Sequence, residues 1–208
     1  MILFALPLVT LGAQTQSFGV CKPVIERSTE VGCWILIDQS VGRAVGPEMY
    51  WHLDAYDDSA RAVRVKGAHG VVIRALGRTW VMIIDATRRR ASQPGTHVAD
   101  IGPLRVTPGL EYSATFMEAI SMPGTTSAVH RHSGPEAWYT VAGETCLETP
   151  AGKLVGRVGH PVVVPEGPPM LLTTTGEHPR RAITLILHDA AQAPTTMETK
   201  WKPRGLCK

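Results

Sequence analysis

The stretch GTTSAVHRHSGPEAWYTVAG, residues 124–143, contains two histidines one residue apart and a glutamate four positions after the second. His130 and His132 are separated by two positions, so on a β-strand both imidazoles leave the same face of the sheet. The turn Ser133-Gly134-Pro135 allows a strand that begins at Glu136 to return antiparallel and to aim its carboxylate at the same point. Two imidazoles and a carboxylate that converge in this way form a metal-ligand set with open coordination positions.

The spacing of this stretch resembles the first motif of the cupin superfamily. The matching positions are Gly124, five residues, His130-x-His132, three residues, Glu136, six residues and Gly143. The framework of the second, shorter motif is also present, as Gly159, five residues and Pro165-x-Gly167. Two residues later, where the family usually has a histidine as fourth ligand, the chain has Met170. The resemblance covers roughly residues 105–190 and implies a cupin-type antiparallel β-barrel, or jelly roll, there.

The sequence after residue 103 reads as β-structure throughout, so we expect a mainly β fold. Turn residues punctuate it about every ten to fifteen positions, as a small jelly roll requires. The expected strands are residues 112–120, 128–132, 136–142, 145–148, 153–158, 161–164, 170–174 and 182–188. We assign residues 104–190 to the barrel and residues 191–208 to a carboxyl-terminal tail.

Residues 18–103 are expected to form a small amino-terminal α+β or degenerate β extension. Short apolar runs at 33–37 and 48–54 read as strands, and Asp57-Asp58-Ser59 supplies an amino-terminal cap for a helix at 60–66. A hairpin is expected from 70–76 and 79–85, which Gly77-Arg78 separates. A second cupin-like half that has lost its ligands is the alternative interpretation.

The first seventeen residues resemble a secretory signal. They contain no charged side chain, and an apolar run from Ile2 to Leu11 ends near Gly12-Ala13, too short for a membrane span. A basic segment at the start is missing, so an apolar strand is the alternative. We predict a periplasmic or secreted protein, with a cytoplasmic one as the alternative.

The chain has four cysteines, an even number that suits two disulfides in an oxidising compartment. Of the three pairings, short separation favours Cys21 with Cys33, which leaves Cys146 with Cys207 to tie the tail to the barrel. Four buried reduced thiols are the alternative. No CxxC pair is present, so the sequence supports neither a thiol redox motif nor a zinc knuckle.

Strand alternation predicts which side chains line the barrel interior beside the metal ligands. If Glu136 faces inward, Trp138 and Thr140 share its face, and Met170, Leu172 and Thr174 share another. Such a pocket is apolar with a few convergent polar groups, so its ligand is expected to be small and partly apolar. The other acids, Glu118, Glu144, Glu148 and Glu166, are expected to be exposed, so no general base is assigned.

Met170 bears on the identity of the metal. We expect one divalent transition-metal ion, namely Fe, Mn, Zn or Ni, for which thioether sulfur is a poor ligand. Met170 would then only shape the pocket. Copper accepts a thioether, so a copper site with Met170 as fourth ligand is kept as the minority hypothesis.

Several functions are excluded or disfavoured by the sequence. The net charge of +3 comes without a basic tract and interleaved aromatics, so no nucleic-acid partner is expected. Neither a glycine-rich phosphate loop nor a Gly-x-Ser-x-Gly motif is present. The other histidines show no spacing that suggests a second site. The family resemblance also implies that barrels can pair through their outer sheets, so a homodimer is a further expectation.

Two functions remain open at this point. The first is a metal-dependent enzyme of the cupin type, which includes oxygenases, isomerases and lyases. The second is a non-catalytic extracytoplasmic protein that binds a small molecule or a metal, copper included. The loss of the fourth histidine favours the second, and the intact first motif favours the first.

Overall fold

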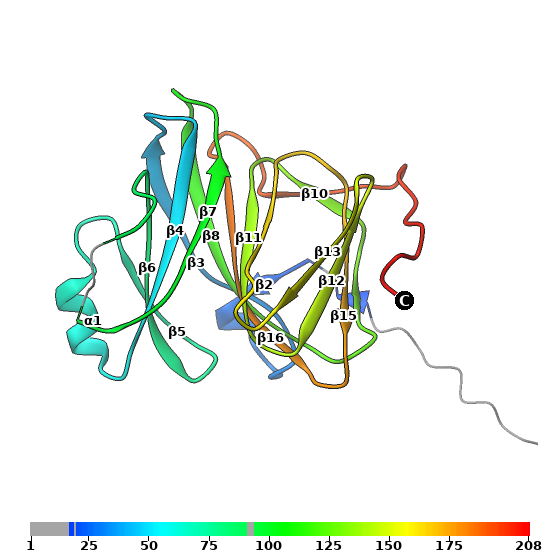
Figure 1. Ribbon diagram of the computed structural model, residues 1–208, viewed down its shortest axis with the longest axis horizontal. Helices are drawn as coiled ribbons and strands as arrows, with labels where there is room; N and C mark the ends of the chain where they lie inside the picture. The colour runs from blue at the N-terminus through cyan, green and yellow to red at the C-terminus, as the bar shows by residue number, and fades with distance from the viewer. Residues whose placement is uncertain (1–16, 19, 91–93) are drawn as a thin grey trace, which may run out of the picture.

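The computed structural model describes residues 17–18, 20–90 and 94–208, and it is built almost wholly from β-strands (Figure 1). Three sheets lie in layers: a four-stranded sheet, a six-stranded sheet in the middle and a five-stranded sheet on the far side. The predicted mainly β fold is therefore confirmed. The expected signal segment at 1–17 lies, apart from its last residue, outside the described residues.

The middle sheet contains six strands, and each strand is antiparallel to its neighbours except β2, which runs parallel to β3. In spatial order they are β14 (Val162–Val164), β11 (Glu136–Ala142), β16 (Arg180–Asp189), β8 (Glu111–Ser121), β3 (Gly32–Arg43) and β2 (Lys22–Pro23). A 3-10 helix, Val24–Glu26, connects β2 to β3. Although β3 precedes residue 104, it pairs along β8. The boundary between sheets therefore does not coincide with the boundary expected after residue 103.

A five-stranded sheet faces the middle sheet and completes the barrel. Its strands are β1 (Ser17–Phe18), β9 (Thr126–Ser127), β15 (Leu171–Thr175), β12 (Glu144–Thr149) and β13 (Gly152–Arg157). A two-stranded sheet of β10 (His130–His132) and β17 (Thr195–Met197) lies at one end of the barrel (Figure 1). The strand expected at 128–132 is thus shortened to β10, which pairs with β17, and the preceding residues 126–127 form the separate strand β9, which pairs with β15.

The four-stranded sheet and the helix α1 (Ser59–Val65) come from residues 48–105. The strands are β5 (Val71–Ala75), β6 (Arg78–Asp85), β4 (Glu48–Tyr56) and β7 (Thr96–Arg105). Asp58 caps the helix, as expected, because its side chain accepts a 2.8 Å hydrogen bond from the Ala60 amide. Within the described part of this unit there is one sheet and no second two-sheeted barrel. None of the helices described is long and apolar enough to cross a membrane.

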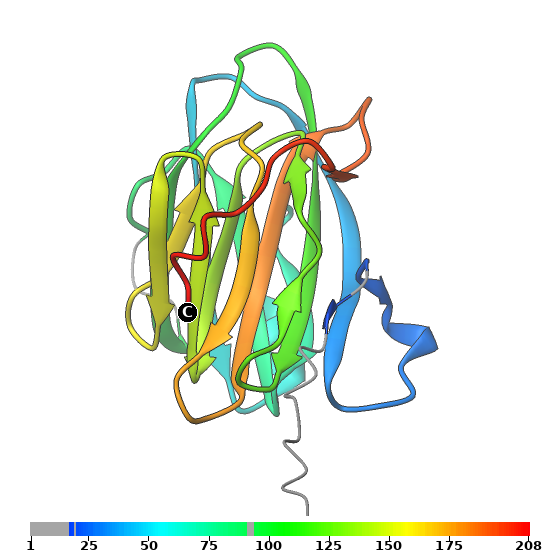
Figure 2. The same cartoon turned by 90° about the vertical axis from the view of Figure 1, so that its right-hand side faces the viewer.

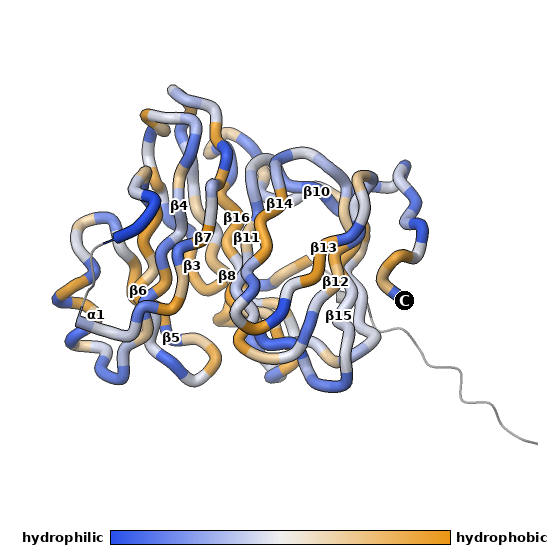
Figure 3. The backbone as a smooth tube through the Cα atoms, viewed as in Figure 1, coloured by the Kyte–Doolittle hydropathy of each residue, from blue (hydrophilic) through white to orange (hydrophobic). Residues whose placement is uncertain are grey.

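The middle sheet is buried on both faces. On β11, Trp138 packs inside the barrel and the adjacent Ala137 packs against the four-stranded sheet, as strand alternation requires. Hydrophobic segments accordingly follow β16 and β11, between the two outer sheets (Figure 3). The core between the middle and the four-stranded sheets is the larger of the two and contains Trp51, Trp80 and Phe116. One continuous body of packed strands therefore supports the barrel.

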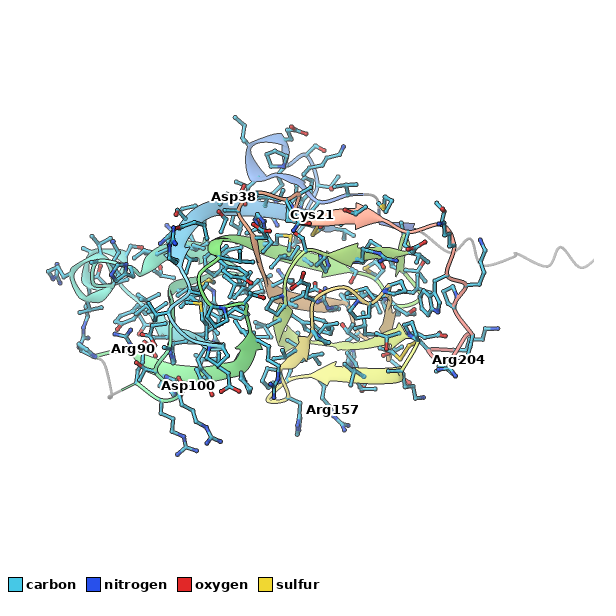
Figure 4. The ribbon with its side chains drawn as sticks, turned by 90° about the horizontal axis from the view of Figure 1, so that it is seen from above. Cys21, Asp38, Arg90, Asp100, Arg157 and Arg204 are labelled. Atoms are coloured by element: carbon cyan, nitrogen blue, oxygen red, sulfur yellow. A yellow bond between two sulfur atoms is a disulfide. The ribbon has the colours of Figure 1, made fainter. Side chains whose placement is uncertain are left out.

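Both predicted disulfides are confirmed: Cys21 pairs with Cys33, and Cys146 pairs with Cys207. The second one fixes the tail, which crosses the outside of the barrel (Figure 2). Figure 4 shows Arg204 on this tail, at the opposite end of the molecule from Arg90 and Asp100. Two disulfides indicate that the chain folds in an oxidising compartment.

Glu148 is a second anchor of the tail. It is fully buried on β12, two residues after Cys146, so both side chains leave the outer face of that strand. Its carboxylate accepts hydrogen bonds from three consecutive tail amides, those of Arg204, Gly205 at 3.0 Å and Leu206 at 2.8 Å. Bonds from several amides to one carboxylate hold a segment that has no regular structure of its own.

We predict that Glu148→Ala lowers the free energy of unfolding by about 1.5–3 kcal/mol, because hydrogen bonds to a charged acceptor are lost and three amides are left without a partner. Hydrogen exchange is the direct measurement: the amides of residues 204–206 are expected to exchange faster, while Cys146–Cys207 keeps the chain end attached. The exposed Glu166→Ala is the matched control. Unchanged exchange at 204–206 would show that the carboxylate does not hold the tail.

Candidate metal centre

His130 and His132 are held so that the same ring nitrogen of each is free. Nδ1 of His130 donates to the carbonyl oxygen of Ala128 at 2.8 Å, and Nδ1 of His132 donates to that of Pro194 at 2.9 Å. A proton on Nδ1 leaves the Nε2 lone pair available, and such a bond also fixes the orientation of the ring. Both imidazoles are thus prepared to bind a cation through Nε2.

Glu136 completes the group. One ligand atom from each of His130, His132 and Glu136 can be chosen so that all three lie within 4.8 Å of one another. Nε2 of His132 lies 3.5 Å from Oε2 of Glu136, and both atoms are buried without a hydrogen-bond partner. Buried polar atoms without partners are unfavourable, and a shared cation satisfies them. Imidazole and carboxylate ligands suit first-row transition metals. The group therefore fits, and can hold, a metal ion.

Two glycines of the motif place β11 against β16. A side-chain carbon at Gly134 would lie 2.0 Å from the carbonyl oxygen of Leu187, so only glycine allows this approach. Gly143 has a φ of 71°, and a side-chain carbon there would lie 2.6 Å from the carbonyl oxygen of Pro179. The spacing between these glycines therefore sets where β11, and with it Glu136, lies in the sheet.

The strand pairings that bring the ligands together differ from those expected. The sequence suggested that the strand carrying the histidines pairs with the strand that begins at Glu136. Instead, β10 pairs with β17 and forms a backbone bridge to Met170, whereas β11 belongs to the middle sheet. The tail thus supplies the support of His132, namely the carbonyl of Pro194 and the hydroxyl of Thr195 at 3.2 Å. No local pattern marks a partner more than sixty positions away.

The charges within the group shift the pKa values of its members. Burial lowers the pKa of His130. Burial alone would also lower the pKa of His132, but the Glu136 carboxylate outweighs it and raises that pKa. Burial raises the pKa of Glu136, yet the combined attraction of His132, His130 and Arg180 leaves it below its ordinary value. The carboxylate therefore keeps its charge, which is the form that binds a cation.

A cavity of about 330 Å³ lies beside the three ligands. This is the size of a site for a small molecule. Its wall is mainly apolar and includes Ile35, Met117, Ala119, Leu172, Ile186 and Met197. Polar groups from Thr115, Thr184 and Arg180 also face it.

Of the residues expected to line the pocket, Leu172 lies in the cavity wall, and the others are buried elsewhere in the barrel. Trp138 and Met170 lie in the adjoining apolar cluster, with Leu147, Val162, Val164 and Ala182. Thr140 and Thr174 are buried, and the Thr174 hydroxyl lies 2.5 Å from that of Ser121. The backbone of Met170 also contacts the site, since its amide donates a hydrogen bond to the carbonyl oxygen of His130 at 2.8 Å.

Arg180 is a site residue that sequence reasoning missed. It is 2% exposed, lies in the cavity wall and stacks over Trp138, with Cζ 5.9 Å from the ring centroid. Burial lowers its pKa to about 10, and Glu136 opposes that shift. Its signal was present in the sequence, because position 180 precedes 182 and 184 on the inward-facing row of β16.

Two of the four acids expected on the surface are buried instead. Glu118 forms an ion pair with Arg27 and accepts a 3.0 Å hydrogen bond from the Leu76 amide. Glu148 holds the tail, as described above. Glu144 is half-buried, and Glu166 is exposed as expected. A sheet that is covered on its outer side buries outward-pointing acids, which the sequence pattern of β8 and β12 could not reveal.

A further cluster of histidines and acids lies on the four-stranded sheet. The ring nitrogens of the buried His52 lie 2.5 Å from Asp100 and 3.3 Å from Asp85. Those of His97 lie 2.9 Å from Asp54 and 3.3 Å from Asp100. These residues form a chain of pairwise contacts across β4, β6 and β7. Among the residues that the structure describes, only His130, His132 and Glu136 converge closely enough to form a metal group.

No family model matches the sequence, and no curated protein matches it. Several solved structures match part of this chain. A cupin-like protein from Thermotoga maritima is 13% identical with a TM-score of 0.38, and the match covers 41% of this chain and 64% of that one. A Klebsiella pneumoniae protein with a double-stranded β-helix domain is 17% identical with a TM-score of 0.37, over 42% of this chain and 76% of that one.

An oxalate oxidase in complex with the substrate analogue glycolate is also similar. It is 17% identical with a TM-score of 0.34, and the match covers 41% of this chain and 45% of that one. The chain thus spans less than two thirds of the oxalate oxidase and of the Thermotoga maritima protein. The motif at 124–143 and the observed pair of facing sheets give this chain a cupin-type barrel, as predicted from its sequence.

Proposed function

We propose that this chain binds one divalent transition-metal ion through His130, His132 and Glu136 and acts as a metal-dependent enzyme on a small, partly apolar substrate. One observation carries the proposal. Three ligand atoms converge in a buried group, and Nε2 of His132 and Oε2 of Glu136 have no other partner. A purely structural cluster would satisfy these atoms with hydrogen bonds inside the protein.

A bound ion in such a set supplies Lewis acidity or redox chemistry. The protein's own contribution is to fix the ligands and to limit water. The carbonyls of Ala128 and Pro194 hold the imidazoles, and the apolar wall surrounds a substrate in a cavity of about 330 Å³. Oxygenase, isomerase and lyase chemistry are all compatible with this arrangement.

The proposed ion is iron, manganese, zinc or nickel, with copper as the alternative. Thioether sulfur favours copper, but Met170 packs among Trp138, Leu147 and other apolar side chains. That packing supports a role in shaping the barrel interior. Under the copper alternative, Met170→Leu would weaken copper binding selectively and leave zinc binding unchanged.

The second candidate is a non-catalytic protein that binds a small molecule or a metal outside the cytoplasm. Met170 at the position of the family's fourth ligand favours it, because three protein ligands bind an ion more weakly than four. Turnover by metal-loaded protein, tested on small carboxylic and hydroxy acids, separates the two candidates. Binding without turnover would support the second.

We expect wild-type protein from native expression to contain about one transition-metal ion per chain, and His130→Ala or Glu136→Gln to lower that content roughly tenfold or more, because the first removes a ligand and the second removes the negative charge of another. Elemental mass spectrometry measures the content, and circular dichroism checks the fold. The exposed His178→Ala, which lies in a turn, is the control. Equal metal content in all four proteins would place the ion outside this site. A metal-free wild type that takes up no added ion would refute the proposal.

We propose further that the protein is exported to the periplasm or secreted, with residues 1–17 as the signal. The two disulfides support an oxidising compartment. Mass spectrometry of the protein recovered from its native compartment tests cleavage of this segment. A homodimer stays a prediction. The outer face of the middle sheet is already covered by the four-stranded sheet, so a dimer would need another surface.

A further inference from the structure

Arg180 is a buried cation that forms no ion pair with the described residues. It lies at the start of β16, it is 2% exposed, and it faces the same cavity as the metal ligands. Its Nε has no hydrogen-bond partner, and the described residues offer it no ion pair within 4.0 Å. The adjacent Arg181 differs: it points to the opposite face and pairs with Glu30 at 2.8 Å. A buried guanidinium that lacks such a partner is unfavourable.

The residues that line the cavity do not neutralise Arg180 once a metal ion is bound. Glu136 is the acidic residue in the cavity wall, and it would then be shared with the ion. A divalent cation, one carboxylate and one guanidinium leave an excess of positive charge in an apolar surrounding. The stacking on Trp138 is weaker than the cost of burying a guanidinium, so it does not account for Arg180 either. The missing component is an anion.

The shape and chemistry of the cavity restrict that anion. A guanidinium presents parallel N–H donors that match the two oxygens of a carboxylate. The remaining wall, which includes Met117, Leu172 and Ile186, favours an apolar group. We infer that this cavity binds a small carboxylate with a short apolar part, whose carboxylate lies on Arg180. The inference deepens the proposed function, on which it rests for the metal ligands that line the same cavity.

Butyrate and its neutral near-isostere butyramide are the probes, and isothermal titration calorimetry measures both. We expect wild type to bind butyrate roughly tenfold or more tightly than butyramide, because only the carboxylate completes the ion pair with Arg180. Arg180→Gln is expected to abolish this preference, and Arg180→Lys to keep part of it. Arg181→Gln, one residue along the same strand but on its other face, is expected to leave it unchanged.

The measurements are made on metal-free protein and on zinc-loaded protein. In the metal-free protein a carboxylate cannot bind a metal, so a preference there comes from protein groups, and its loss in Arg180→Gln assigns it to Arg180. The preference would survive even if His130, His132 and Glu136 bound no ion. A failure of the proposed metal site and a failure of the proposed carboxylate site therefore give different results. No preference in metal-free wild type, or an undiminished preference in Arg180→Gln, would overturn the inference. The wild-type comparison stays valid if the Arg180 variants do not fold.

Discussion

Replacing Trp51 by alanine is expected to lower the free energy of unfolding by about 3–5 kcal/mol, because a large buried ring is removed and its cavity closes only in part. Trp51 lies on β4 and is 0% exposed. Its ring is 6.1 Å from that of Phe116 on β8, at an interplanar angle of 51°. The pair joins the four-stranded sheet to the middle sheet. The loss is a large part of the stability of an ordinary domain.

Urea unfolding monitored by far-ultraviolet circular dichroism and by tryptophan fluorescence measures this effect. Because one core connects the two sheets, we expect both signals to change in a single transition in wild type and in Trp51→Ala. The control is Val45→Ala, at a side chain that is 90% exposed, with an expected change within about 0.5 kcal/mol. Two separate transitions in wild type would show that residues 48–105 unfold independently of the barrel.

The parts of this structure that the sequence predicted are specified by residues close together in the chain. Gly77 has a φ of 76° and closes the β5–β6 hairpin, so the turn could be recognised directly. The Asp58 cap and the helix that follows were visible for the same reason. His130, His132 and Glu136 lie within seven consecutive positions, and their spacing predicted that they converge.

The parts that escaped prediction depend on pairings distant in sequence. β3 pairs with β8, from Arg43 opposite Glu111 to Gly32 opposite Ile120. No residue pattern within β3 indicates that β8 is its partner. The contact between His52 and Asp100 likewise depends on the register of β4 against β7. Arg180 is an intermediate case. Alternation along β16 gives it an inward direction only because the strand begins at Arg180 instead of at 182 as expected, and its lack of an ion pair is a property of the folded barrel.

A bound metal ion is expected to stabilise the protein by about 4 kcal/mol when the free ion is roughly 1,000-fold above its dissociation constant, because the folded chain binds it and the unfolded chain does not. Thermal unfolding with and without added zinc measures the shift at neutral to slightly alkaline pH. His132→Ala is expected to lose the shift entirely, since it removes one of three ligands. The exposed His160→Ala is expected to retain it.

The stabilisation by the bound metal ion is expected to decrease as the pH falls. An imidazole binds a metal ion only when Nε2 is deprotonated. Because Glu136 raises the pKa of His132 against the effect of burial, protons begin to compete with the ion above the ordinary histidine value of 6.5. Glu136 itself stays charged, because the attraction of His132, His130 and Arg180 holds its pKa below its ordinary value. Metal stabilisation is therefore complete on the alkaline side of the His132 pKa and is lost as the pH falls through it.

Below that point the affinity for the ion is expected to fall about tenfold per pH unit, since one proton is displaced on binding. The fall steepens only at lower pH, where His130 is also protonated, because burial lowers the pKa of His130. Thermal shifts measured from roughly pH 5 to pH 8 distinguish this behaviour from binding by carboxylates alone, which persists until the acids themselves are protonated. A zinc shift of constant size across that range, or one that survives in His132→Ala, would place the ion on other ligands.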